Sequence, residues 1–237
     1  MTFACFLLLS PVSASNTRDT EYLLPQTNPF DAAYLDTLVF FGESTTAHLR
    51  SREVLSGGKK TTQVWADDSG TRMLSSQGLS TPILYPETGE LLTVFEACAK
   101  KRPSYLVLSF GINGISKFVE HKELYVNNYQ KLIHTVQSAS PDTKIILQTV
   151  YPVRTANGFS VDTETLNRYI TVLNDWLFEI ASENENVKIA DTASVLRDTD
   201  GKLLAAYDAG DGLHLNKQAY QAILHYLGTH AWPESEN

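Results

Sequence analysis

The stretch Thr37-Leu38-Val39-Phe40-Phe41-Gly42-Glu43-Ser44 decides the fold. Its apolar residues are continuous and do not alternate with polar ones, which is typical of a strand buried on both faces of a sheet. Similar runs recur along the chain and are separated by segments with helical spacing. Parallel strands need crossover connections, which are usually helical and right-handed, so this alternation predicts a parallel sheet. We expect about five strands, at 37–41, 62–66, 105–110, 144–150 and 187–190.

The clearest helix is predicted over 163–182, where apolar residues recur at spacings of three or four and form one stripe. Asp162 or Thr163 can cap its start. Together with the strands, the helices predict an α/β fold, a three-layer α/β/α sandwich, in one domain over 32–232. The polar segment 15–31 is interpreted as a linker or a surface arm. Other helices are predicted over 45–55, 91–101, 124–138 and 217–230.

Composition limits the number of domains and the class of partner. The chain has 237 residues, of which 43% are hydrophobic, enough for one sizeable core. Its formal net charge is -8, and no run of Lys or Arg concentrates positive charge locally. Such a surface repels phosphate backbones and anionic lipid, so we expect no nucleic-acid partner.

The N-terminus contains a short apolar run followed by small residues. Residues 3–9 are mostly apolar, and Val12 and Ala14 suit signal peptidase cleavage after Ala14. We therefore expect 1–14 to be a signal peptide and the protein to be secreted or extracytoplasmic. No transmembrane segment is expected, because a bilayer span takes about 20 apolar residues. The alternative is a mis-assigned start or a terminal tail, because the run lacks the basic residues that usually precede it.

The two cysteines indicate neither a disulfide nor a metal site. Cleavage after Ala14 removes Cys5 and leaves Cys98 alone in the mature chain. Cys98 stands among apolar residues and is interpreted as a small buried side chain. Neither cysteine has the neighbours that a metal site requires.

Ser44 directly follows the first predicted strand, at a strand-to-helix turn. The free amides of such a turn can bind an oxyanion, and the turn can expose a nucleophile. The alternative is that Ser44 only caps the helix.

A second polar group, Asn113, follows the strand at 105–110 in a glycine-rich turn. Its side-chain amide can stabilise negative charge on a substrate oxygen, although Asn in such a place also simply closes turns.

The third group lies near the C-terminus, in the loop Asp208-Ala209-Gly210-Asp211-Gly212-Leu213-His214. Asp211 and His214 are close enough in sequence for the carboxylate to orient the imidazole while its other nitrogen faces a nucleophile. Taken singly, Asp211 is also a common turn former and His214 a common surface residue.

Ser44, Asn113 and the Asp211/His214 pair together resemble the SGNH/GDSL family of serine hydrolases over about 36–227. The resemblance implies a flavodoxin-like sheet, Ser44 as nucleophile, His214 as base, Asp211 as its carboxylate partner and Asn113 as an oxyanion donor. The Ser44 amide and a glycine complete the implied oxyanion hole, with Gly70 preferred over Gly78. The sequence departs from the family pattern at Glu43 and Gly114, where the family usually has Asp.

The resemblance implies an ester hydrolase that forms an acyl-enzyme and needs no metal or organic cofactor. The expected substrate is a small-molecule or carbohydrate ester, with acetyl esters of polysaccharide as one form. Two alternatives stay open: an acyltransferase that uses the same acyl-enzyme, and a non-catalytic carbohydrate-binding domain on the same fold. His48, four residues after Ser44, is a rival base.

Overall fold

The computed structural model describes residues 20–27, 29–66 and 72–233. Five strands form one parallel sheet in the order β2-β1-β5-β6-β7. Numbered along the chain, this is the flavodoxin-like order 2-1-3-4-5. The predicted fold class is therefore confirmed. The strands are β1 Leu38–Gly42, β2 Val64–Trp65, β5 Tyr105–Ser109, β6 Lys144–Gln148 and β7 Val187–Ala190.

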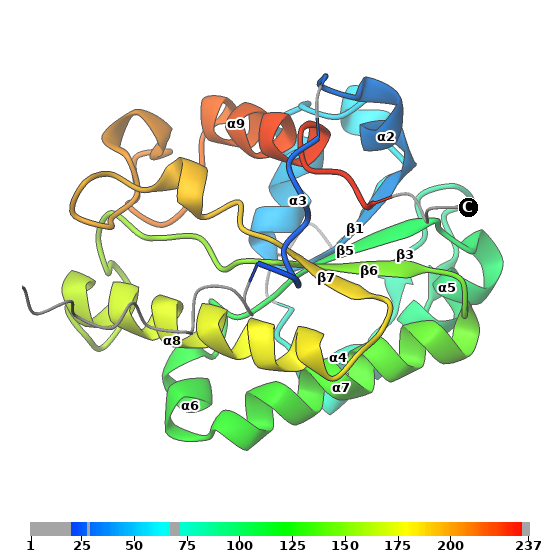
Figure 1. Ribbon diagram of the computed structural model, residues 1–237, viewed down its shortest axis with the longest axis horizontal. Helices are drawn as coiled ribbons and strands as arrows, with labels where there is room; N and C mark the ends of the chain where they lie inside the picture. The colour runs from blue at the N-terminus through cyan, green and yellow to red at the C-terminus, as the bar shows by residue number, and fades with distance from the viewer. Residues whose placement is uncertain (1–19, 28, 67–71, 234–237) are drawn as a thin grey trace, which may run out of the picture.

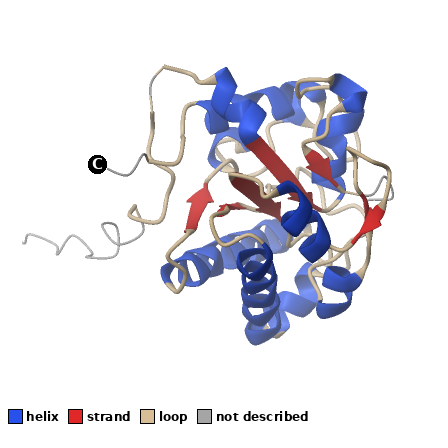
Figure 2. Ribbon diagram, turned by 90° about the vertical axis from the view of Figure 1, so that its right-hand side faces the viewer, coloured by secondary structure: helices blue, strands red, loops and turns tan. Residues whose placement is uncertain are grey.

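Helices cover both faces of this sheet (Figures 1 and 2). Side chains of β1 alternate between two apolar layers, with Leu38 and Phe40 on one face and Val39 and Phe41 on the other. Both layers are apolar, which explains why the sequence run is continuous. One layer contains α2 Ala32–Thr37, α3 Ser44–Ser51 and α9 Lys217–Gly228; the other contains α5 Val94–Lys101, α6 Ile115–Glu120, α7 Lys122–Ala139 and α8 Thr163–Ser182.

Two predicted helix boundaries are wrong: the helix expected over 45–55 ends at Ser51, and the helix expected over 91–101 begins later. Leu91 and Leu92 form a strand, β4, which pairs antiparallel with β3 Ile83–Leu84. Helix α5 begins only after Thr93, whose side chain accepts from the Glu96 amide while the Glu96 side chain accepts from the Thr93 amide. This capping box fixes the start of the helix. The remaining elements are α4 Ser76–Ser80 and the 3-10 turns Gly58–Lys60, Ser194–Leu196 and Ala205–Tyr207.

Residues 22–24 of the polar segment 15–31 run along the edge strand β7. The Leu24 amide donates to the Ile189 carbonyl at 2.8 Å, and the Ile189 amide donates to the Tyr22 carbonyl at 2.8 Å. Leu24 is buried. The proposed signal peptide lies outside the described residues. Within the described residues, no helix is long and apolar enough to cross a membrane.

The carboxyl end of β1 is packed tightly against its neighbours. A Cβ atom at Gly42 would lie 2.4 Å from the Ser109 carbonyl oxygen and 2.3 Å from Thr46 Oγ1. Only glycine fits there, so the chain turns directly from β1 into α3. Ser44 is thereby placed at the carboxyl edge of the sheet, where parallel α/β sheets bind ligands.

Candidate active site

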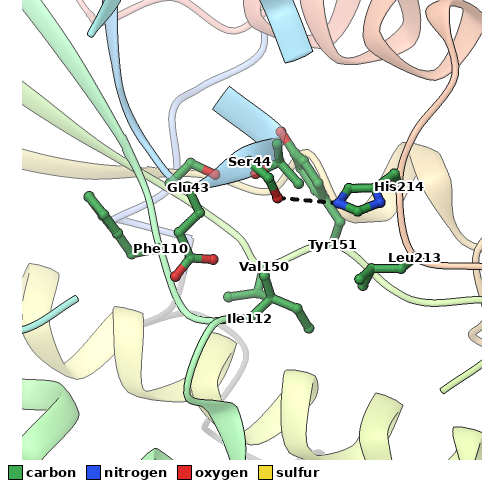
Figure 3. Close-up of a pocket in the computed structure, with 10 residues that line it drawn as sticks. Glu43, Ser44, Phe110, Ile112, Val150, Tyr151, Leu213 and His214 are labelled. Atoms are coloured by element: carbon green, nitrogen blue, oxygen red, sulfur yellow. Dashed lines mark hydrogen bonds between the residues drawn. The ribbon is translucent and has the colours of Figure 1, made fainter. Parts of the chain in front are cut away.

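The predicted site residues come from loops that follow strand ends and from the loop before α9. Ser44 opens α3 after β1, Asn113 follows β5, and Asp211 and His214 precede α9. A small cavity lies where these segments meet (Figure 3). It is lined by Glu43, Ser44, Thr45, Ser109, Phe110, Ile112, Val150, Tyr151, Leu213 and His214.

The Ser44 hydroxyl points toward the His214 imidazole (Figure 3), with 3.4 Å between Oγ and Nε2. At this distance the imidazole is within reach of the hydroxyl proton. Tyr220 of α9 stabilises the first turn of α3, because its hydroxyl donates to the Thr45 carbonyl at 2.9 Å. Two elements distant in sequence therefore fix the serine beside the histidine.

Asp211 binds His214 through both of its carboxylate oxygens. Oδ2 lies 2.6 Å from His214 Nδ1, while Oδ1 accepts from the amides of His214 at 2.7 Å and Leu213 at 2.9 Å. Partial burial raises the pKa of Asp211. The hydrogen bonds from His214 and Leu213 lower this pKa by more, to about 2. The carboxylate stays ionised and keeps Nε2 of the imidazole turned toward Ser44.

The loop that carries Asp211 and His214 is fixed at Gly212. This residue has φ +79°, and its carbonyl accepts from the amides of Arg154 at 2.8 Å and Thr155 at 3.2 Å. The Gly212 amide donates to Asp208 Oδ1 at 2.9 Å. The sequence analysis did not identify these contacts, which join the loop after β6 to the histidine loop.

His48 lies beside His214 and not over Ser44. The two imidazole rings meet edge to face, with 4.9 Å between their centroids. Burial lowers the pKa of His48, and the nearby His214 and Arg52 lower it further. His48 therefore stays neutral and packs against the imidazole that faces the serine.

Asn113 lies in the loop after β5, next to the cavity-lining Ile112. Its side-chain Nδ2 donates to the Arg72 carbonyl at 2.9 Å, and its backbone amide donates to Glu43 Oε2 at 3.2 Å. Its role as an oxyanion donor stays a prediction. Gly70 lies outside the described residues. Gly78 lies in α4, where its amide donates to Ser75 Oγ at 2.9 Å.

The aromatic side chain of Tyr151, in the loop after β6, lines the cavity. Phe118 is instead buried in the core, and Phe159 packs against that core. No cluster of three or more His, Cys, Asp or Glu side chains within the described ranges is arranged to hold a metal ion.

The fold is similar to that of several solved structures. The structure is similar to a candidate platelet activating factor from Streptococcus pneumonia, with TM-score 0.58, 23% identity and 90% of each chain covered. It is also similar to a candidate acylhydrolase from Bacteroides fragilis, with TM-score 0.57, 17% identity, and 90% of this chain and 93% of that one covered. A GDSL-like lipase from Bacteroides thetaiotaomicron gives TM-score 0.54 at 14% identity, with 88% and 91% covered.

At these identities the structural likeness establishes the fold alone. No curated protein matched the sequence. Residues 40–222, however, match the model of the GDSL-like lipase/acylhydrolase family, and this range takes in Ser44, Asn113, Asp211 and His214. The chain therefore belongs to the GDSL-like lipase/acylhydrolase family and is an ester hydrolase.

Proposed function

We propose that the protein is a serine esterase in which Ser44 is the nucleophile, His214 the general base and Asp211 the group that orients His214. The observation that carries the proposal is the continuous line of contacts from Ser44 Oγ to His214 Nε2 and from His214 Nδ1 to Asp211 Oδ2. These are the relative positions that acyl transfer through a serine requires.

The mechanism follows from these positions. His214 Nε2 takes the proton of Ser44 as Oγ attacks the ester carbonyl, and Asp211 stabilises the imidazolium that forms. The oxyanion meets the amide at the start of α3 and the Asn113 side chain. When the tetrahedral intermediate collapses, the C–O bond to the alcohol breaks and His214 returns the proton to the alcohol oxygen. Water, deprotonated by the same imidazole, then attacks the acyl carbonyl. The bond to Ser44 Oγ breaks, His214 returns the proton to Oγ, and the acid is released.

The size of the cavity supports a short acyl group. Its volume is about 20 Å³, and Ile112, Val150 and Leu213 give it apolar walls. A space of roughly 10 to 15 Å³ holds one water-sized group, so the enclosed part of the cavity fits an acetyl methyl. We therefore propose acetyl esters as substrates, and rates should fall along the series acetyl, butyryl, octanoyl.

The proposal also includes secretion, on the basis of the apolar run and small residues within 1–14. For an exported esterase of this kind, we propose that the alcohol component of the ester is a carbohydrate. Release of acetate from acetylated polysaccharide, compared with release from a small chromogenic acetyl ester, tests that component separately from the catalytic assignment.

The test of the nucleophile is labelling with a fluorophosphonate probe followed by mapping of the modified residue. We expect the label on Ser44, and Ser44→Ala should lose about 10⁴-fold or more in turnover while it stays folded. Ser51→Ala is the matched control, because this serine lies on the same helix and, among the described residues, its hydroxyl donates to the His48 carbonyl at 3.4 Å and to no other group. A label on another residue, or near wild-type turnover in Ser44→Ala, would overturn the proposal.

A further inference from the structure

Glu43 is a buried carboxyl group that the proposed mechanism does not use. It stands between β1 and α3, immediately before Ser44, where the family pattern usually has Asp. Its side chain is only 1% exposed. A buried carboxyl group is costly unless it is well hydrogen-bonded, so its contacts indicate why it is tolerated there.

The carboxyl group accepts from successive amides of the loop that contains Asn113. The Gly111 amide donates to Oε1 at 3.0 Å, the Asn113 amide donates to Oε2 at 3.2 Å, and the Ile112 amide adds a third bond. The backbone of Glu43 makes two further hydrogen bonds. Its amide donates to the Ser109 carbonyl at 3.2 Å, and its carbonyl accepts from the Thr46 amide at 2.9 Å. One residue therefore joins the end of β5, the first turn of α3 and the Asn113 loop.

The surroundings of Glu43 make this contact sensitive to pH. Burial raises the pKa of Glu43 to about 8, although the three amides oppose the shift. Tyr125 and Tyr129 of α7 face it; burial raises the pKa of both, and the Glu43 carboxyl raises them further. Above its pKa, Glu43 offers two charged oxygens to the three amides. A glutamine offers one oxygen and an NH₂ group that cannot accept from an amide.

We propose that Glu43 is a positioning residue that acts through Asn113: its carboxyl group holds loop 111–113 in register with Ser44, so that the oxyanion donor keeps its place. The inference rests on the proposed function, because it concerns the same oxyanion. The physical reason is that a displacement of about 1 Å in a group that stabilises the transition state can cost about 10²-fold in rate.

The test is a double-variant cycle on the full chain, with a chromogenic acetyl ester as substrate. It uses wild type, Glu43→Gln, Asn113→Ala and the double variant. Well above the pKa of Glu43, we expect Glu43→Gln to lower kcat by about 10²-fold with little change in KM. Asn113→Ala should lower kcat by about 10²- to 10³-fold. If Glu43 acts through Asn113, the double variant is no slower than Asn113→Ala alone.

The pH profile separates positioning from a purely structural role. Below its pKa, Glu43 carries a proton and resembles glutamine, so the ratio of wild-type kcat to Glu43→Gln kcat should rise as the pH passes through about 8. Ionisations that the two proteins share cancel in this ratio. Glu43→Asp keeps a carboxylate and should lose less activity than Glu43→Gln.

Gln63→Met is the control for loss of a buried polar side chain elsewhere. Gln63 Nε2 donates to the carbonyls of Leu35 at 2.7 Å and Leu38 at 2.8 Å, at the opposite end of β1, so the variant should lose thermal stability but keep kcat. The role of Glu43 would be overturned, and the proposed function would stand, if the ratio of wild-type to Glu43→Gln kcat did not depend on pH. The same holds if the kcat losses of the two single variants multiplied in the double variant. Full activity in Ser44→Ala would overturn the proposed function and, with it, this role.

Discussion

Asp211 uses its two oxygens for two different tasks. Oδ2 binds the imidazole of His214, and Oδ1 binds the amides of the same short turn. Because its folded-state pKa is depressed from 3.8 to about 2, Asp211 contributes stability that is present above pH 3.8. That stability is lost as the pH falls through about 2. The carboxylate is therefore ionised well above this range, so protonation of Asp211 does not limit activity near neutral pH.

Replacement of Asp211 by Asn should separate orientation from charge. Asn keeps the size of the side chain but removes the charge that stabilises the imidazolium and favours the reactive tautomer. The same change in a comparable triad lowers kcat by about 10⁴-fold, and we expect a similar loss from Asp211→Asn. The measurement is kcat for acetyl ester hydrolysis, together with the melting temperature to verify folding.

His48→Ala provides the comparison for that variant. It should keep most of the activity and the acid limb of the pH–activity profile. If His48→Ala removed the acid limb while Asp211→Asn left kcat within tenfold of wild type, His48 and not His214 would be the base.

At the scale of elements, the loop before α9 depends on the backbone conformation of Gly212. A Cβ atom there would lie 1.7 Å from Thr155 Oγ1, and its φ of +79° is strained for any other residue. We expect Gly212→Ala to displace the loop from residues 154–155 and to move His214 away from Ser44. Misplacement by about 1 Å predicts a loss of about 10²-fold or more in kcat.

Gly201→Ala is the matched control for the Gly212 variant. Gly201 has φ +77°, and a Cβ atom there meets nothing within 4 Å. It therefore carries the same backbone strain without the collision. Similar losses of activity in the two variants would show that backbone strain, and not contact with Thr155, causes the effect of Gly212→Ala.

The sequence was most informative where a pattern is long and purely local. Helix α8 has the predicted bounds Thr163–Ser182, because its apolar stripe is continuous and Asp162 accepts from the Thr165 amide as a cap. The short elements were not predicted. α4 has five residues, and β3 and β4 have two each, too few for a period to show. Leu91 and Leu92 fit a helical pattern equally well, but pairing with β3 decides their conformation.

The features of the site also divide into those that the sequence could predict and those that it could not. Ser44 and Asn113 could be predicted at one edge of the sheet, because the ends of parallel strands meet there. The Asp211/His214 pair was predicted beside Ser44 from the family resemblance. The contacts of Glu43 with Gly111 and Asn113 could not be predicted, since they join segments 68 and 70 residues apart and depend on how two loops fold. The packing of His48 against His214 depends likewise on the turn that starts α3.

At the scale of the whole molecule, the accessibility of the Cys98 thiol can be used to detect opening of the core between the sheet and α5. Its side chain is 0% exposed, and burial raises the pKa of its thiol to about 12. Because the thiolate is the reactive form, we expect a Cys5→Ser variant to resist iodoacetamide when folded. Labelling should begin only at the denaturant concentration at which the molecule unfolds. Labelling well below the unfolding midpoint by circular dichroism would show that this layer opens locally.

The segment that runs along β7 has a consequence for solubility. β7 ends the sheet, and an uncovered outer edge would offer free amides and carbonyls to a second molecule. Tyr22 and Leu24 occupy these groups at Ile189. A chain shortened beyond residue 24 would keep its catalytic loops but leave this edge open to intermolecular strand addition. We therefore expect the shortened chain to self-associate more readily than the full chain.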